Sequence, residues 1–105
     1  MSRKFLALDS SSAMVFDGSL ADTWSVQLVG SVLSARTRLI SPGRLYTFII
    51  IQGATTTHQF NFPITCRNAA PMTPEPGTML IQNFIGDTGG WLYSNIPAAY
   101  LPFPS

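Results

Sequence analysis

Residues that interrupt helices occur throughout this 105-residue chain, which contains eight glycines and eight prolines among many serines and threonines. An amphipathic helix needs apolar residues every three to four positions over about 10 residues or more. Gly and Pro break every window in which such a stripe begins, whereas strand patterns recur. The sequence therefore predicts an all-β protein of about six to eight strands, enough for a sandwich or a small barrel. Of these we expect a single antiparallel β-sandwich or jelly-roll-like domain with extended terminal arms.

The middle of the chain contains the clearest strand patterns. Trp24, Val26, Leu28 and Val32 alternate with polar residues, as in a half-buried strand. Residues 41–44 read Ser-Pro-Gly-Arg, which suits a type II turn. Residues 45–52 are β-branched or aromatic on both faces, which is typical of a strand buried on both sides.

The segment after residue 52 predicts the partner of that strand. Residues 53–57 have the length of a hairpin loop. In the following residues Phe60, Phe62 and Ile64 alternate, and Pro63 places this strand at a sheet edge or ends it. The stretch 42–63 is therefore predicted to form a β-hairpin.

The two ends of the chain complete the predicted organisation. Residues 79–86, a turn at 87–90 and residues 91–96 predict a second hairpin, and residues 5–8 and 13–16 predict short strands. The tail after residue 96 is apolar and rich in proline, so it cannot join a central strand. We divide the chain into an N-terminal arm with short strands (1–22), a sandwich core (23–96) and a Pro-rich C-terminal arm (97–105).

Charged side chains are scarce, at 10% of the residues against about 25% in typical soluble domains. Such a chain is expected to be poorly soluble unless neighbours cover part of its surface, which favours an oligomer or a larger assembly. The net charge of +1 provides no field to attract nucleic acid or an anionic membrane. Arg36, Arg38 and Arg44 could form a basic patch, but solvated positions on a strand and a turn are the expected state.

Reactive groups are few, and the sequence predicts no catalytic residue, cofactor or metal site. His58 is the only histidine and is expected to be a half-exposed strand residue. Cys66 is the only cysteine and is expected to be a small buried hydrophobe, because Cys–His catalysis also needs an orienting group and an oxyanion site. Zinc would need three or four Cys or His ligands.

Two short motifs resemble catalytic sequences. Asp87 begins an Asp-Thr-Gly triplet like that of dimeric aspartic proteases, but too little chain follows it, and a hairpin turn is expected. Residues 9–12, Asp-Ser-Ser-Ser, have no accompanying base to activate a serine and are expected to be a flexible or turn-forming segment. Aromatic residues on strands could instead stack on sugars or bases, although core positions are the usual role; these are Trp24, Trp91, Tyr46, Tyr93 and Tyr100.

The order of the segments TWSVQLVGSVLS, SPGRLYTFIIIQGATTTHQFNFP and PMTPEPGTMLIQNFIGDTGGWLY resembles a β-sandwich module of tailed-bacteriophage virion proteins over about residues 23–93. The module joins a Trp- or Phe-led strand, a Pro-Gly turn, a Tyr-Thr-Phe-Ile-Ile-x-Gln strand and a Phe-x-Phe-Pro strand to a Gly-Trp-Tyr-like end. Residues 53–57 depart from it, because an acidic residue and a glycine are usual there.

The resemblance implies a non-enzymatic structural protein, often trimeric. Because little lies outside the module, it favours a capsid decoration (cement) protein that is assembled in the host cytoplasm, docks on the major capsid protein at the capsid surface of the virion and stabilises the head. The alternatives are a tail, neck or fibre-associated subunit and, in another class, a receptor- or glycan-binding module; an enzyme is the last choice. The apolar terminal arms are the candidate contacts with partners: Arg3, Phe5, Leu6, Leu8, Tyr100, Leu101 and Phe103.

Overall fold

The computed structural model describes residues 4–53, 57–69, 73–94 and 98–102, and these residues form nine strands and no helix. The all-β prediction is confirmed, with one strand more than expected. None of the described residues belongs to a helix that is long and apolar enough to cross a membrane. The strands are β1 (Phe5–Asp9), β2 (Ala13–Asp17), β3 (Thr23–Gln27), β4 (Ser34–Arg38), β5 (Leu45–Ile51), β6 (Cys66–Arg67), β7 (Thr78–Gly86), β8 (Leu92–Tyr93) and β9 (Ala99–Pro102).

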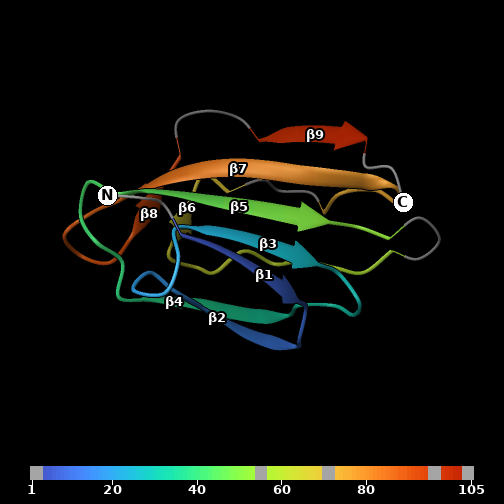
Figure 1. Cartoon of the computed structure of the whole chain (residues 1–105), viewed down its shortest axis with the longest axis horizontal. Coiled ribbons are helices and arrows are strands. Elements are labelled where there is room, and N and C mark those ends of the chain that lie inside the picture. Colours follow the sequence, from blue (N-terminus) through green and yellow to red (C-terminus); the bar gives the residue numbers. More distant parts are fainter. Residues whose placement is uncertain (1–3, 54–56, 70–72, 95–97, 103–105) are drawn as a thin grey trace.

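Most of these strands belong to one mixed sheet with the order β1-β3-β5-β7-β8-β6, and β9 is an additional partner of β7. Strands β2 and β4 form a second, two-stranded sheet that lies beside the first (Figure 1). The pairs β1–β3, β3–β5, β2–β4 and β6–β8 are parallel. The predicted antiparallel sandwich is therefore wrong for these four pairs, and only the three pairs that contain β7 are antiparallel.

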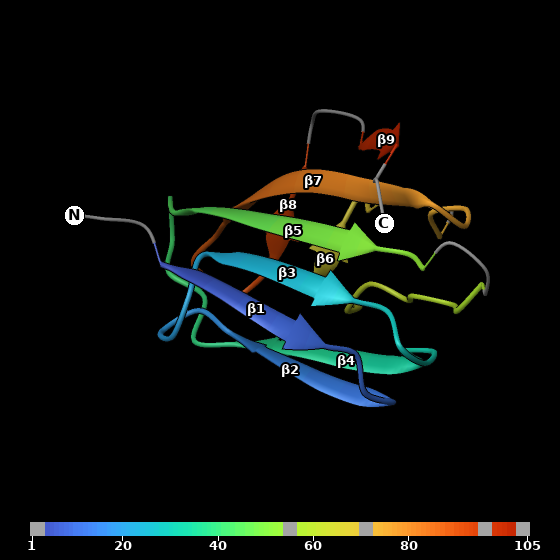
Figure 2. The same cartoon turned by 45° about the vertical axis from the view of Figure 1, so that its right-hand side comes forward.

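Three of the four parallel pairs, β1–β3, β3–β5 and β2–β4, arise because the first half of the chain winds as a coil between the two sheets (Figure 2). Each turn of the coil places one strand in the main sheet and returns through the second layer, so β1, β3 and β5 stack in the same direction. The backbone continues this stacking past the strand ends: the Ser10 N–H donates to the Gln27 carbonyl (2.9 Å) and the Leu28 N–H to the Ile51 carbonyl (2.9 Å).

The third turn of the coil explains why the first predicted hairpin is wrong. After β5 the chain does not fold back beside it but crosses to the second layer, where Phe60 forms a parallel bridge with Val32. The buried amide of Gln52 holds this crossing, because its Nε2 donates to the carbonyls of His58 (2.8 Å) and Pro74 (3.1 Å). Ile64 is 82% exposed, so it does not share the buried face of Phe60.

The core lies between the two layers. It consists of the alternate residues of each strand that point toward the other layer. Trp24 and Phe48 are neighbours in the sheet and fully buried, and Phe16 of β2 packs edge-on against both rings at 5.4 and 5.0 Å between centroids. The predicted burial of Trp24, Val26, Leu28 and Val32 is confirmed. Strand β5, however, is fully buried on one face only, since Thr47, Ile49 and Ile51 are half-buried and Leu45 is exposed.

The predicted turns are observed. Gly43 has φ of 74°, and the Arg44 N–H approaches the Ser41 carbonyl at 3.4 Å, as expected for a Pro-Gly type II turn. The second hairpin is confirmed as the antiparallel pair β7–β8. Both predicted N-terminal strands form, as β1 and β2, and part of the C-terminal segment forms β9 at an outer edge.

Candidate interaction surface

The terminal segments form strands at opposite sides of the main sheet. Strand β1 is the first strand in the sheet order, and β9 lies beyond β7 on the other side. Figures 1 and 2 both show β9, β7, β5, β3 and β1 in that order. The candidate contact residues Phe5, Leu6 and Leu8 are thus far from Tyr100 and Leu101, so the structure does not unite them in one site; Arg3 and Phe103 lie outside the described residues.

Strand β1 is held in place by a buried carboxylate from the next turn of the coil. Asp22 is 2% exposed. Its Oδ1 accepts the Lys4 backbone N–H (3.1 Å), and its Oδ2 accepts Nη2 of Arg44 (3.1 Å). One carboxylate therefore ties together the beginnings of all three turns, because Lys4, Asp22 and Arg44 precede β1, β3 and β5.

Ser10 fixes the other end of β1. Its hydroxyl donates to the Gly30 carbonyl (2.9 Å) and accepts the N–H groups of Val29 (2.9 Å) and Gly30 (3.1 Å). Asp9 is the last residue of β1, and the Ser10 hydroxyl that follows it is occupied by these backbone groups.

The first turn of the coil, β1 with β2, presents two free strand edges. Among the described residues, β1 pairs only with β3 and β2 only with β4. Phe5 is 63% exposed, and the inward Leu6 and Leu8 remain half-buried where their neighbours Trp24 and Val26 are fully buried. Free edges that contain neither proline nor a bulge can accept an additional strand. We call β1 and β2 the end coil.

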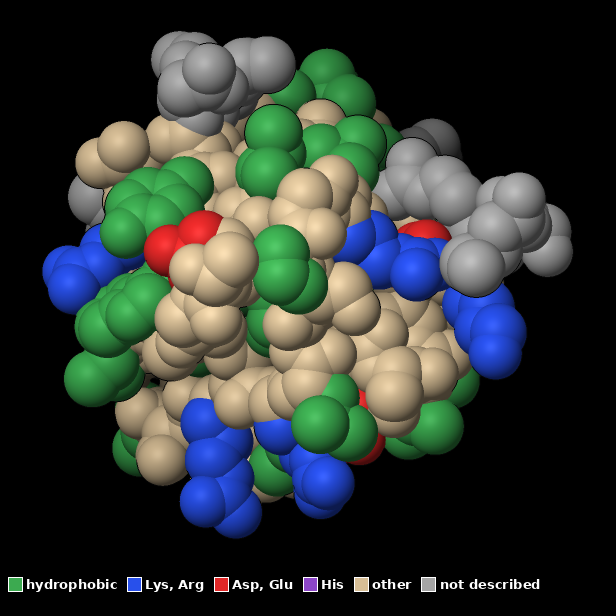
Figure 3. Space-filling model, turned by 90° about the vertical axis from the view of Figure 1, so that its left-hand side faces the viewer, with side chains coloured by type: hydrophobic (Ala, Val, Ile, Leu, Met, Phe, Trp, Pro, Cys, Tyr) green, Lys and Arg blue, Asp and Glu red, His purple; other side chains and the backbone are tan. Residues whose placement is uncertain are grey.

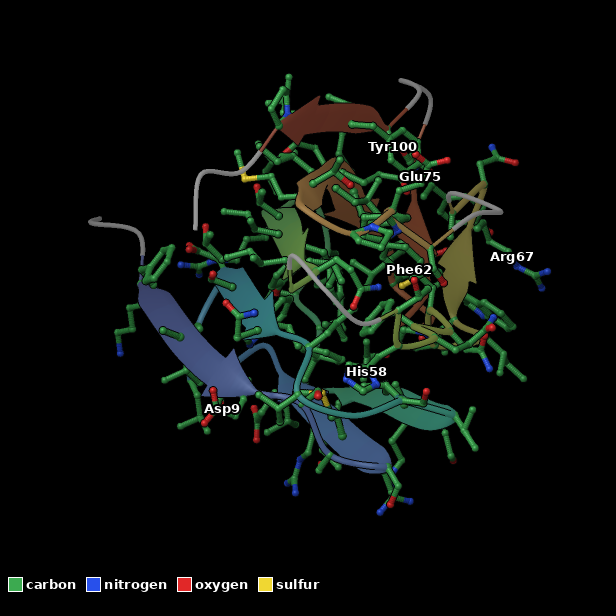
Figure 4. All side chains as sticks on the ribbon, turned by 90° about the vertical axis from the view of Figure 1, so that its right-hand side faces the viewer. Asp9, His58, Phe62, Arg67, Glu75 and Tyr100 are labelled. Atoms are coloured by element: carbon green, nitrogen blue, oxygen red, sulfur yellow. The ribbon has the colours of Figure 1, made fainter. Side chains whose placement is uncertain are left out.

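Strand β9 turns its two faces to different surroundings. Tyr100 lines a pocket of about 240 Å³ together with Thr73, Glu75 and Thr78, and Figure 4 shows Tyr100 beside Glu75. Leu101 lies opposite Met79 of β7, on the other face of the sheet. Both residues are exposed, at 45% and 41%.

The candidate reactive groups are not brought into a catalytic arrangement. Cys66 is buried, as predicted, and burial raises the pKa of its thiol to about 12, which keeps it protonated at neutral pH. The His58 backbone N–H donates to Oε1 of Gln52 (3.1 Å). Among the described residues, no group of three His, Cys, Asp or Glu side chains could hold a metal ion.

Asp87 stabilises the turn that the sequence predicts at residues 87–90. Its Oδ1 accepts the N–H groups of Gly89 (2.8 Å) and Trp91 (2.9 Å), and Gly90 adopts a φ of 83°. The carboxylate thereby closes the β7–β8 hairpin, which is the structural role expected of the Asp-Thr-Gly triplet.

The arginines are dispersed. Arg36 and Arg38 are exposed on β4, where Arg38 pairs with Asp17 (3.3 Å), whereas Arg44 pairs with Asp22 on another element. Arg67 lies over the ring of Trp91 at 4.2 Å from its centroid. On the end of the molecule shown in Figure 3, the Lys and Arg side chains lie in separate groups. The solvated positions expected for Arg36 and Arg38 are thus observed.

Sequence reasoning missed one surface, the outer face of β5, β7 and β9. Ile49 and Ile81 are opposite each other at its centre and only half-buried. The β-branched residues on both faces of β5 predicted a strand that is buried on both sides. No described segment covers that face, and the composition of β5 alone does not distinguish a face that is covered by the same chain from one that is not.

Comparisons of the chain with protein-family models, with curated proteins and with solved structures give no match.

Proposed function

We propose that this chain is a non-enzymatic structural protein of a tailed bacteriophage, a capsid decoration protein that docks on the assembled head and stabilises it. The resemblance of residues 23–93 supports the virus class. The single observation that carries the docking role is the end coil, with its two free edges and the exposed ring of Phe5.

The end coil can accept a partner through its backbone. An extended segment of the major capsid protein would pair with the free edge of β1 and bury Phe5 and the half-buried Leu6 and Leu8. A protein that binds only the assembled shell stabilises that shell by mass action. We further propose that the protein acts as a homotrimer, because three linked edges bind a lattice more tightly than one edge does.

Co-sedimentation of the protein with purified heads tests this function. We expect wild-type protein to sediment with heads and Phe5→Glu to lose most of this binding, because the substitution places a charge beside the β1 edge. Ile64→Glu is the matched control, since Ile64 is 82% exposed and lies outside the nine strands. Point variants are preferable to deletion of residues 1–9, which would also remove Leu6 and Leu8 from the core.

The same assay separates the alternatives in the virion. Sedimentation with purified tails but not with heads would replace the decoration role by a tail, neck or fibre-associated role. No sedimentation with either particle would contradict the virion proposal.

A glycan-binding role is a second candidate, favoured by one pocket. A cavity of about 390 Å³ beside β8 is lined by Tyr93, which is 49% exposed, together with Asn68 and Asp87. An exposed aromatic ring next to amide and carboxylate groups is a plausible set of contacts for a sugar. A glycan array would support this role if binding occurs and Tyr93→Ala abolishes it.

A further inference from the structure

The pocket beside β9 combines a carboxylate and an aromatic ring. It has a volume of about 240 Å³ and is lined by Thr73, Glu75, Thr78 and Tyr100. Figure 4 shows Glu75 and Tyr100 as neighbours, although they come from different segments of the chain. Sites for small molecules usually have volumes of about 300–1,000 Å³. This pocket is smaller, so it fits one side chain or a fragment of similar size.

The segment that carries Glu75 is fixed on both sides of this residue. The preceding Pro74 carbonyl accepts Nε2 of the buried Gln52 (3.1 Å). The carbonyl of Glu75 itself accepts both the hydroxyl (2.7 Å) and the N–H (3.1 Å) of Thr78. A pocket wall that is already held by such bonds loses little conformational freedom when a ligand binds.

The hydroxyls of both threonines in the pocket are bonded within the chain. The Thr78 hydroxyl donates to the Glu75 carbonyl, and the Thr73 hydroxyl accepts the Phe60 N–H (3.1 Å). The carboxylate of Glu75 and the ring of Tyr100 are therefore the groups of the pocket that are best placed to bind a ligand.

The carboxylate of Glu75 makes the pocket negative. Within the described residues, Asp17 pairs with Arg38 at 3.3 Å. Asp22 pairs with Arg44 at 3.1 Å. No described Lys or Arg forms such a pair with Glu75, which is exposed. A cationic ligand is therefore complementary in charge to this pocket.

The ring of Tyr100 narrows the type of cation. Quaternary ammonium groups are usually held in cages of several aromatic rings, and they have no N–H donor for a carboxylate. Tyr100 is the only aromatic residue among the described residues that line this pocket. A guanidinium group suits one ring and one carboxylate, because it is flat, stacks on an aromatic face and presents N–H donors in its own plane.

We propose that the pocket between Glu75 and Tyr100 binds an arginine side chain of a partner protein, with the guanidinium over the Tyr100 ring and its N–H groups toward the Glu75 carboxylate. Tyr100 is 45% exposed, so its side chain is accessible from solvent. The pocket lies at β9, whereas the proposed docking edge is β1 on the opposite side of the main sheet. The site is thus a second contact, and it does not depend on the proposed function.

An NMR titration of the full chain with N-acetyl-arginine methylamide tests this site. We expect chemical-shift changes at the four lining residues and a dissociation constant on the order of 1 mM, because so small a ligand makes few contacts. The citrulline analogue has nearly the same shape without the charge and should bind about 5-fold more weakly. The lysine analogue and choline should also bind more weakly than the arginine probe.

Two substitutions test the two walls of the pocket separately. Glu75→Gln keeps the size of the side chain and should weaken arginine binding about 5-fold, because it removes an exposed charge pair. Tyr100→Leu should weaken it about 3-fold, whereas Tyr100→Phe keeps the ring and should bind as wild-type protein does. Asp9→Asn, which removes an exposed carboxylate at β1, is the control and should also leave binding unchanged.

Well-dispersed amide spectra establish that each variant is folded. Equal binding of the arginine and citrulline probes would overturn the site, and so would unchanged binding in folded Glu75→Gln. Lysine or choline binding as tight as that of the arginine probe would overturn the assignment to arginine. A protein that sediments with heads but does not bind the arginine probe would contradict this inference and leave the proposed function. Arginine binding by a protein that sediments with no virus particle would do the reverse.

Discussion

The two faces of the main sheet are built from the same strands but have different surroundings. Inward residues such as Trp24 and Phe48 are fully buried among aromatic rings. The outward residues Ser25 and Ile49, one position further along each strand, are half-buried. Because side chains alternate along each strand, one face of the sheet forms the core and the other face lies at the surface.

The outward surface also differs along its own width. It is polar over β3, which presents Thr23, Ser25 and Gln27, mixed over β1, which presents Phe5, Ala7 and Asp9, and mostly apolar over β5, β7 and β9. Leu45, Ile85 and Leu101 are exposed on this mostly apolar part, whereas other exposed apolar side chains, such as Leu33 and Ile64, lie elsewhere on the molecule.

The largest expected change in the free energy of unfolding comes from a substitution on the inward face. Trp24→Ala removes a fully buried ring that contacts Phe16, Tyr46 and Phe48. We expect the free energy of unfolding to fall by about 3–5 kcal/mol, as measured by denaturant unfolding. Ser25→Ala is the outward neighbour and is expected to change it by less than about 0.5 kcal/mol. Equal losses in the two variants would remove the distinction between the faces.

A smaller loss is expected from the buried carboxylate that joins the turns of the coil. Asp22→Ala removes the acceptor for the Lys4 N–H and for the partly exposed Arg44 guanidinium. We expect a loss of about 2–3 kcal/mol in denaturant unfolding, because hydrogen bonds to charged groups are stronger than neutral ones. Asp9→Ala, on the exposed outward surface, is the control. A change in Asp22→Ala no larger than in the control would contradict this role.

The polar pair on the outer face of β5 and β7 is expected to matter less. Asn83→Ala removes the acceptor for the Thr47 hydroxyl on an exposed position. Cross-strand pairs of this kind contribute about 0.2–1 kcal/mol, so thermal unfolding should shift only slightly. A loss as large as that of Asp22→Ala would mean that the outer face is as important to folding as the core.

The smallest effect concerns pH and lies on the edge of the second sheet. Donation from the Ser19 hydroxyl, then from its N–H, and attraction by Arg38 lower the pKa of Asp17 below its usual 3.8. A lowered carboxyl pKa contributes stability that is present above pH 3.8 and is lost as the pH falls through the folded-state pKa. An NMR titration should show the Asp17 pKa rising toward 3.8 in Ser19→Ala. An unchanged pKa would contradict this cause.

Local patterns predicted several of the strands but not their directions, and the strand predicted around Phe60 and Phe62 is only an isolated bridge at Phe60. The alternation around Trp24, the Pro-Gly turn at Gly43 and the β7–β8 hairpin follow from side-chain spacing and turn chemistry, and each is observed. A parallel and an antiparallel partner require the same alternation, however, so the sequence alone did not distinguish a coil from a sandwich.

The hairpin that was predicted for residues 42–63 does not form, and a long-range contact explains why. Residues 53–57 have a length that suits a hairpin, but the buried amide of Gln52 bonds to His58 and Pro74 and directs the chain to the second layer. Such a long-range contact leaves no local sequence signature. Of the candidate interaction residues, Phe5 and Leu101 are exposed as an interface would need, whereas Leu6 and Leu8 face inward.

Native mass spectrometry of the full chain tests the central claim most directly, because it counts the copies held together without any substitution. The account predicts a dominant species of three 11.4-kDa chains at micromolar concentration. A single-chain species at every concentration at which the protein stays soluble would contradict it.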